Sequence, residues 1–181
     1  YLLAWTTTPW TLNANTALAV SKDVEYAEVE LEGQKFILAK DLLDKALTDE
    51  KHQVLPYRIS RTFKGEELVG KSYEPLFANR GERAHKIWDA WFIHTEEGTG
   101  IAHEAPAYGE EDYQLSKENN VPLVLDTDEE GIYTEGEWQG KQVWEVNKEI
   151  AKALHERGVV WKVDYITHSY PHCHRCGTKL M

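Results

Sequence analysis

Short runs of alternating apolar and polar residues dominate most of the chain. In residues 26–31 apolar side chains alternate with glutamates, and Gly33 then turns the chain into a second apolar run at 35–39. Such alternation is typical of half-buried strands, and the short glycine-containing connection predicts a hairpin. Further short apolar runs predict strands at residues 17–20, 57–63, 87–95, 101–105, 121–125 and 159–166.

Helical spacing is clearest in residues 143–157. Four apolar residues form one stripe there, and Gly158 marks the expected end of the helix. Shorter helices are predicted for residues 41–47 and 112–119. Many short strands with few helices predict a mainly β fold with peripheral helices, closed or nearly closed into a β-barrel.

The most unusual stretch is residues 5–15, in which four threonines and two tryptophans occur within eleven residues. Threonine favours strands, so a strand is predicted from Tyr1 to Thr8. It should break at Pro9, which lacks the backbone donor of a central ladder. Taken alone, such a run bonds its hydroxyls to backbone and water.

Composition narrows the possible functions. The chain has a formal net charge of −11, with 41% hydrophobic and 28% charged residues, as in an ordinary soluble domain. No apolar run approaches the ~20 residues that span a bilayer. The acidic excess argues against nucleic-acid binding, which favours a basic footprint. Arg58, Arg61 and Lys64 form a basic cluster that is either a solvated strand face or a contact for RNA phosphates.

Two stretches together resemble a known family. Residues 5–15 read WTTTPWTLxAN, and residues 98–113 read GTGxxHxAPxxGxxDY. These patterns are similar to the editing (connective-peptide) insertion of isoleucyl-tRNA synthetases, which are class I aminoacyl-tRNA synthetases. Supporting matches lie at 73–77 and 170–173, and departures from the usual residues lie at Asn13 and Glu104.

The resemblance implies an editing β-barrel domain at residues 1–166. Residues 167–181 would be a connecting segment that leads back to the body of a larger cytoplasmic enzyme. The implied reaction is proofreading, in which valine wrongly attached to tRNA(Ile) is hydrolysed, with valyl-adenylate as a further substrate. The expected partners are the 3′ end of the mischarged tRNA, free valine or valyl-adenylate-like ligands, and the rest of the synthetase. The fragment is expected to be a monomer that contacts no membrane.

This chemistry needs little beyond an oriented water, because aminoacyl esters are already activated. By resemblance, Asp112 would bind the substrate ammonium group, although it could also cap a helix. His103 would line the pocket and help to place the water, and Thr7 completes the expected catalytic set. A nucleophilic triad of a threonine, His103 and Asp112 is an alternative that the spacing does not require. The implied substrate-binding residues are Trp5, Thr6, Thr7, Thr8, Trp10, Thr11, Asn15, His103 and Asp112.

The need for such a site follows from energetics. A synthetic pocket sized for isoleucine rejects valine by only ~1–3 kcal/mol, a limit for which isoleucyl-tRNA synthetases are themselves the standard example. A second pocket that is too small for isoleucine can hydrolyse the valine product. The threonines, His103 and a nearby tryptophan would form its wall.

Cys173 and Cys176 form a Cys-x-x-Cys, which is half of a tetrahedral zinc site. Nearby histidines, including His168, or a second cysteine pair before Tyr1 would complete a structural zinc site in the intact enzyme. The thiols could equally be unligated. Editing is expected to need no cofactor, and ATP would serve only the synthetic domain outside this chain.

Three alternatives stay open at this point. The chain could be the editing domain of a valyl-tRNA synthetase, which clears threonine. It could be a non-catalytic module that binds an RNA end or a protein, or a zinc-dependent hydrolase that a chelator would inactivate. The deacylation of valyl-tRNA, compared with threonyl-tRNA, separates the first alternative from the main hypothesis.

Overall fold

The computed structural model describes residues 1–164 and 172–178, which fall into two compact units. The first unit contains residues 1–6 and 11–125, and the second contains residues 7–10 and the described residues from 126 onward. The domain boundary predicted at residue 166 lies outside the described residues.

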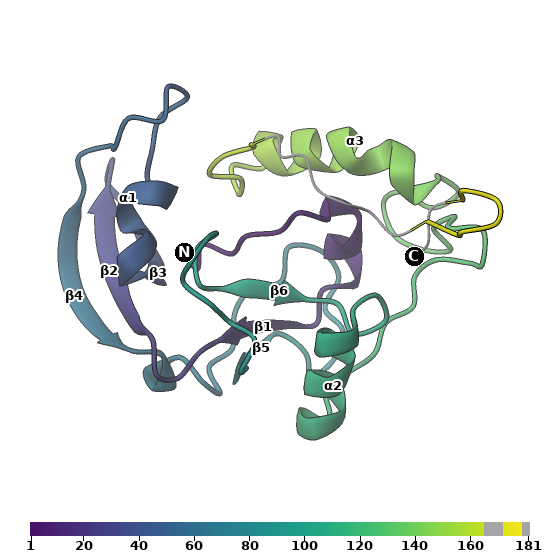
Figure 1. Ribbon diagram of the computed structural model, residues 1–181, viewed down its shortest axis with the longest axis horizontal. Helices are drawn as coiled ribbons and strands as arrows, with labels where there is room; N and C mark the ends of the chain where they lie inside the picture. Colours follow the sequence, from purple (N-terminus) through teal and green to yellow (C-terminus); the bar gives the residue numbers. More distant parts are fainter. Residues whose placement is uncertain (165–171, 179–181) are drawn as a thin grey trace. The chain divides into compact units, whose positions relative to one another are not determined.

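The first unit contains two three-stranded sheets (Figure 1). In one sheet, β1 (Ala17–Val20) lies between β5 (Lys86–Asp89), which runs parallel to it, and β6 (Ala102–Glu104), which runs antiparallel. All four residues of β1 are buried. Its Ala-Leu-Ala-Val sequence suits this position, because a strand that is covered on both faces has no need of alternating polar residues.

The second sheet places β2 (Glu25–Leu31) between two antiparallel neighbours, β3 (Gln34–Ala39) and β4 (Arg58–Lys64). The predicted hairpin is confirmed, since Leu31 pairs with Gln34 across a two-residue turn. Both turn residues, Glu32 and Gly33, have positive φ values of 52° and 78°. Positive φ at both positions gives the turn a twist that matches the two strands.

Helical segments connect the strands of the first unit. The 3₁₀ segment η2 (Lys40–Leu42) runs into α1 (Leu43–Ala46), where a short helix is predicted. A second 3₁₀ turn, η3 (Gly65–Glu67), follows β4. Helix α2 (Glu110–Asn119) begins two residues before its predicted start, and its C-cap residue, Asn120, has a left-handed backbone conformation.

The second unit contains α3 (Val143–Glu156), which confirms the clearest helix prediction. Its apolar stripe is buried, and Gly158 follows the helix with a φ of 69°. The Gln142 side chain accepts a hydrogen bond from the Trp144 backbone and so caps the first turn. In the part of the chain that the structure describes, none of the helices is both long enough and apolar enough to cross a bilayer.

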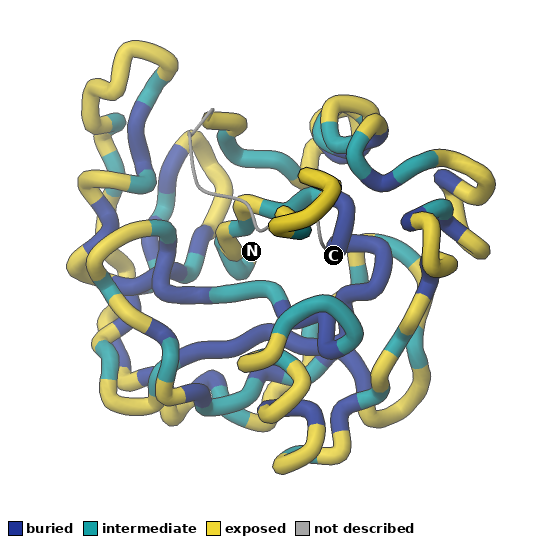
Figure 2. The backbone as a smooth tube through the Cα atoms, turned by 45° about the vertical axis from the view of Figure 1, so that its right-hand side comes forward, coloured by how far each residue is buried: buried dark blue, intermediate teal, exposed yellow. Residues whose placement is uncertain are grey.

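One hydrophobic core joins the two sheets of the first unit. Leu18 and Val20 of β1 pack with Tyr26 of β2, Phe63 of β4 and Ile87 of β5. In Figure 2 the buried stretches of the backbone are dark blue, among them all four residues of β1. The core therefore fixes where β1 and its neighbour β6 lie.

A second cluster covers the other face of β1. Ala17 and Ala19 pack there with Leu115 of α2 and with Val121 just beyond that helix. The small alanines allow α2 to approach the strand, because side chains alternate across a strand and leave room on this face. Helix α2 is thereby held against the sheet that carries β6.

The predicted closed or nearly closed β-barrel is wrong. Among the described residues the strands form two three-stranded sheets, and neither is closed into a barrel. The predicted strand from Tyr1 to Thr8 is replaced by isolated bridges at Leu2 and Trp5, and the 3₁₀ segment η1 (Pro9–Ala14) follows. A barrel needs a continuous ladder around its circumference, which isolated bridges do not supply.

Three other predicted strands are absent or shortened. Residues 121–125 and 159–164 form no strand, and residues 165–166 lie outside the described part. In place of the strand predicted at 87–95, β5 ends at Asp89. An apolar run or an alternating pattern provides an apolar surface but not a partner strand for the backbone groups, and Pro122 also lacks a donor.

Candidate functional site

Strand β6 directs two neighbouring polar side chains to opposite faces of its sheet. In the register of β6 against β1, His103 pairs with Leu18 and Glu104 pairs with Ala17. Paired residues share a face and successive residues alternate. His103 therefore lies on the face of Leu18, whereas Glu104 lies on the face that Ala17 shares with α2.

A hydrogen-bonded cluster surrounds His103. Its Nε2 lies 2.8 Å from Thr11 Oγ1, and its Nδ1 lies 3.2 Å from Asn15 Nδ2. Asn15 Nδ2 also donates to the Ala17 carbonyl at 2.8 Å, and Asn15 Oδ1 accepts from the Tyr73 hydroxyl at 2.5 Å. The fold thus brings together Thr11, Asn15 and His103, which the sequence predicts as substrate-binding residues, and adds Tyr73 to them.

These bonds fix the protonation of the His103 ring. The Asn15 amide presents an N–H to Nδ1, so Nδ1 accepts, and Nε2 carries the hydrogen and donates to Thr11. Burial lowers the pKa of His103 to about 4, because a charged imidazole is poorly solvated there. Because Nε2 carries the hydrogen in this tautomer, it cannot take a proton from the Thr11 hydroxyl, and Thr11 and His103 do not form a nucleophile–base pair in this arrangement.

Asp112 lies in the first turn of α2 and is tied to the end of β6. Its Oδ2 accepts the Ala105 N–H at 2.8 Å, and the N-cap of the helix is Gly109. Asp112 is therefore not the N-cap residue of α2, which was one of its two expected roles. A Cβ at Gly109 would lie 2.5 Å from Asp112 Oδ1, so the glycine leaves the space that the carboxylate occupies.

Glu104 is a site residue that the sequence analysis did not select. Its side chain is 1% exposed and hydrogen-bonded to the Asp112 carboxyl group. Burial, together with the charge of Asp112, raises the pKa of Glu104 to about 9. Burial also raises the pKa of Asp112, against the lowering effect of the Ala105 N–H. The available signal was a glutamate within an apolar strand, at a position where the family pattern has a neutral residue.

Trp5 and Thr6 lie in the segment that runs beside β6, before the His103 cluster. Trp5 forms a β-bridge to Ala102, and its backbone N–H donates to the Ile101 carbonyl at 3.1 Å. The Trp5 ring lies against Gly98, where a Cβ would come within 2.8 Å of it. Trp5 is thereby held beside β6, and Thr6 is half-buried.

Thr7, Thr8 and Trp10 belong to the second unit. Thr7 is exposed, and its hydroxyl lies 3.4 Å from that of Thr8. Trp10 is buried, donates its backbone N–H to Asn147 Oδ1 at 3.1 Å, and stacks edge-on against Trp144 with ring centroids 5.6 Å apart. Within this unit Trp10 is a core residue, and the catalytic role of Thr7 stays a prediction.

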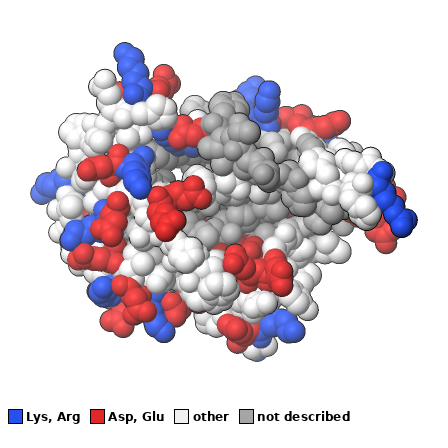
Figure 3. Space-filling model, viewed as in Figure 1, with Lys and Arg blue, Asp and Glu red and all other residues white. Residues whose placement is uncertain are grey.

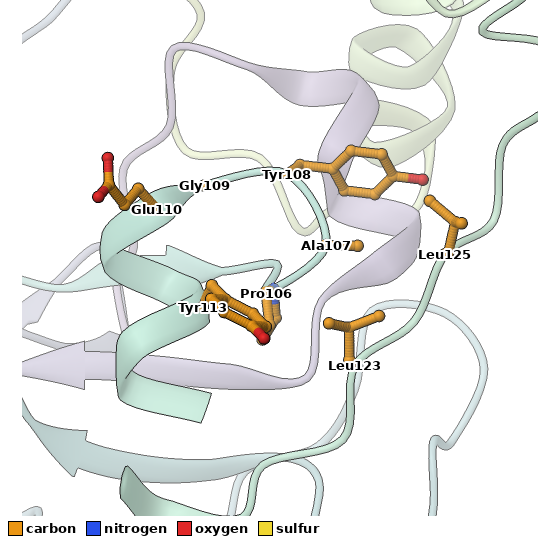
Figure 4. Close-up of a pocket in the computed structure, with 8 residues that line it drawn as sticks. All are labelled: Pro106, Ala107, Tyr108, Gly109, Glu110, Tyr113, Leu123 and Leu125. Atoms are coloured by element: carbon orange, nitrogen blue, oxygen red, sulfur yellow. The ribbon is translucent and has the colours of Figure 1, made fainter. Parts of the chain in front are cut away.

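An open hollow of about 450 Å³ lies beside the loop that joins β6 to α2 (Figure 4). Tyr113, Leu123 and Leu125 line it and are exposed. The rest of its lining is Pro106, Ala107, Tyr108, Gly109 and Glu110. The residues that the sequence predicts for substrate binding lie outside this lining, although Gly109 links the hollow to the space around Asp112.

The basic cluster of β4 is engaged in ion pairs. Arg58 lies 2.5 Å from Glu30, and Arg61 lies 3.4 Å from both Glu28 and Glu67. On the face in Figure 3, basic and acidic side chains are interspersed over this sheet. The arrangement favours the interpretation of the cluster as a solvated strand face, because each arginine already has an acidic neighbour.

Cys173 and Cys176 are free thiols in the described residues, and Cys176 Sγ lies 3.1 Å from Thr178 Oγ1. Hydrogen bonding by Thr178 lowers the pKa of Cys176 to about 7. Within residues 1–164 and 172–178, no group of three metal-binding side chains occurs. His168 lies outside the described residues. The two thiols are chemically suited to zinc but supply only half of its ligands.

Comparisons with known proteins follow the resemblance in sequence. The chain is 44% identical to the isoleucine–tRNA ligase of Clostridium novyi (strain NT) over 185 residues, which cover 100% of the chain and 17% of that protein. It is 44% identical over 190 residues to the enzyme of Bdellovibrio bacteriovorus, covering 99% and 18%, respectively. The chain thus spans less than a fifth of the length of these curated relatives. No protein-family model matches the chain.

Solved structures share the fold. The structure of GlLeuRS-CP1 aligns with a TM-score of 0.71 and 13% identity, covering 93% of this chain and 85% of that one. The editing domain of P. falciparum cytosolic leucyl-tRNA synthetase aligns with a TM-score of 0.65 and 13% identity, covering 86% of this chain and 76% of that one. At such identities the likeness concerns the fold alone. Sequence and fold agree: the chain is similar along its whole length to a part of isoleucine–tRNA ligases, and it shares the fold of a leucyl-tRNA synthetase editing domain.

Proposed function

We propose that the chain proofreads tRNA(Ile) by hydrolysing the ester of wrongly attached valine, with valyl-adenylate as a second substrate. The observation that carries this proposal is similarity along the whole chain to isoleucine–tRNA ligases, combined with a fold like that of synthetase editing domains. Its partners would be the 3′ end of mischarged tRNA(Ile) and the rest of the synthetase. Free cysteines suit a reducing compartment, so we place this activity in the cytoplasm.

Asp112 is the group that we assign to the α-ammonium of the substrate. The Ala105 N–H orients one carboxylate oxygen, and a carboxylate retains further acceptor sites for a cationic donor. A charge-assisted bond of this kind would hold the aminoacyl end in one position. Positioning is the main requirement here, because the ester is already activated.

The His103 cluster would form a fixed polar wall for the reacting group. Its neutral ring, the Thr11 hydroxyl and the Asn15 amide are held in place by mutual hydrogen bonds. Groups fixed in advance can orient a water and stabilise the developing oxyanion without reorganising during the reaction. Water would add to the ester carbonyl, and the ribose oxygen would leave with a proton to give valine and free tRNA.

The test is a deacylation assay of the chain with valyl-, threonyl- and isoleucyl-tRNA. Asp112→Asn is the sharpest variant, because it retains an acceptor for the Ala105 N–H and removes only the charge. We expect valyl-tRNA to be hydrolysed, isoleucyl-tRNA to be spared, and Asp112→Asn to lose at least a hundredfold in kcat/KM, roughly the cost of losing a buried charged contact. Glu118→Gln, an exposed change on the same helix, is the matched control.

Each alternative predicts a different outcome of this assay. Preference for threonyl-tRNA would indicate the valine enzyme's domain, and saturable binding without turnover would indicate a non-catalytic module. Loss of activity with a chelator would indicate a zinc-dependent hydrolase. Full activity of Asp112→Asn would remove the ammonium-binding role. We also expect no aminoacylation by this chain, whatever the ATP concentration.

We further propose that Cys173 and Cys176 supply two thiolates of a structural zinc site in the complete synthetase. The lowered pKa of Cys176 favours the thiolate that zinc requires. The expected result is about one zinc per complete synthetase, lost in Cys176→Ser, with deacylation by this chain insensitive to chelators. Absence of zinc from the complete synthetase would contradict this site.

A further inference from the structure

Glu104 is a buried carboxyl group for which the mechanism above has no use. It belongs to β6 and faces α2, on the side opposite to His103. Within the described residues its Oε2 makes no hydrogen bond, although the side chain is only 1% exposed. An ionised carboxylate with an unpaired oxygen is very costly at such a position, so Glu104 is expected to be neutral.

The neighbour of Glu104 is the carboxyl group to which substrate binding is assigned. The Glu104 side chain is hydrogen-bonded to Asp112, and two carboxyl oxygens can share such a bond only if one carries a proton. Two neighbouring carboxylates cannot both stay charged without a large energetic penalty. Glu104 is more buried than Asp112, which also has the Ala105 N–H to stabilise its charge. The proton therefore belongs on Glu104.

We propose that Glu104 is a positioning residue that donates a hydrogen bond to Asp112, so that the two side chains act as one acid pair presenting a single, fixed negative charge to the substrate ammonium group. The proposal rests on the proposed editing function. The Ala105 N–H and the Glu104 O–H would hold the Asp112 carboxylate between them. Because Gly109 has no Cβ, the Asp112 carboxylate can lie against the start of α2.

The surroundings of the pair are acidic or neutral. Glu111 of α2 faces the same region, and its charge disfavours ionisation of both partners. Tyr73 interacts with Glu104 from the segment before β5, and burial keeps this phenol protonated, with its pKa raised. The charge of Glu111 therefore favours a proton on the pair, and so does burial, which raises the pKa of Glu104 to about 9.

The first arm of the test needs no substrate. Carboxyl carbons of the chain labelled at Glu and Asp would be followed by NMR between pH 4 and 10, in wild type and in Glu104→Gln. We expect the Glu104 resonance to titrate only at alkaline pH, and the Asp112 resonance to respond at the same pH in wild type but not in the variant. Titration of Glu104 near the ordinary value of 4.5, or an Asp112 signal that ignores Glu104, would overturn the pair.

The second arm measures valyl-tRNA deacylation at pH 7. Glu104→Gln retains a donor for Asp112, so we expect activity within about twofold of wild type. Glu104→Leu removes the donor, and we expect a loss of roughly tenfold, mainly in KM, as for one charged hydrogen bond. Equal losses in both variants, or none in either, would contradict the positioning role. A normal titration of the pair with no deacylation by wild type would instead count against the proposed function.

Discussion

Replacing Glu104 by glutamine should stabilise the protein at neutral pH. The substitution keeps the size of the side chain and a donor for Asp112, but removes the ionisable proton. In the folded chain burial raises the pKa of Glu104 from 4.5 to about 9. The folded state therefore holds a proton that the unfolded state releases between these two pH values, and stability falls as pH rises through that window.

The magnitude follows from the gap between pH and the unfolded pKa. At pH 7 the gap is about 2.5 units, and at ~1.36 kcal/mol per unit the glutamate costs roughly 3 kcal/mol relative to glutamine. The side chain is only 1% exposed, so solvent screens little of this cost. The difference between the two proteins should vanish near pH 4.5 and grow steadily up to about pH 9.

His103 also affects how the free energy of unfolding of the wild-type protein depends on pH. Burial lowers the pKa of this imidazole from 6.5 to about 4, so the unfolded state binds a proton that the folded state lacks, and stability rises with pH between these values. Between pH 4.5 and 6.5 the opposing slopes of His103 and Glu104 should nearly cancel. Above pH 6.5 wild type should lose stability, whereas Glu104→Gln should stay level.

Urea unfolding, followed by the fluorescence of the seven tryptophans, measures the free energy of unfolding of wild type and Glu104→Gln from pH 4.5 to 9. Glu118→Gln, which removes an exposed carboxylate from α2, is the control and should follow wild type. A stability gain in Glu104→Gln that does not change with pH would refute the reasoning. So would a wild type that is as stable at pH 8.5 as at pH 6.

Two further substitutions probe the geometry around the site. Gly109 has a φ of −136°, which any residue adopts, so Gly109→Ala should leave α2 intact. Its Cβ should displace the Asp112 carboxylate and lower kcat/KM for valyl-tRNA by tenfold or more. An unchanged kcat/KM would show that Asp112 can move without loss of activity. Thr11→Val removes the acceptor of the His103 Nε2–H and should cost about 1–3 kcal/mol in the free energy of unfolding, whereas Thr11→Ser should cost much less. Equal stability of the valine and serine variants in urea would contradict a stabilising hydrogen bond between Thr11 and His103.

The sequence determined the local elements whose signals are complete within a short window. The hairpin of β2 and β3 was predictable because its alternation and its glycine turn agree. Helix α3 was predictable because its apolar stripe and the glycine at its end lie within one segment. The motifs at residues 5–15 and 98–113 also indicated the similarity to isoleucine–tRNA ligases, because such patterns do not depend on the architecture around them.

The tertiary structure decided what depends on pairing and burial. Closure into a barrel requires partner strands, and neither the apolar run at residues 121–125 nor the alternation at 159–164 specifies one. The sequence placed His103 and Asp112 near one another along the chain, but the pleat of β6 turned His103 towards Thr11 and Asn15, and Glu104 towards Asp112. The protonation of Glu104 was likewise decided by burial, because the pKa of a carboxyl group depends on its surroundings in space and not on its neighbours in sequence.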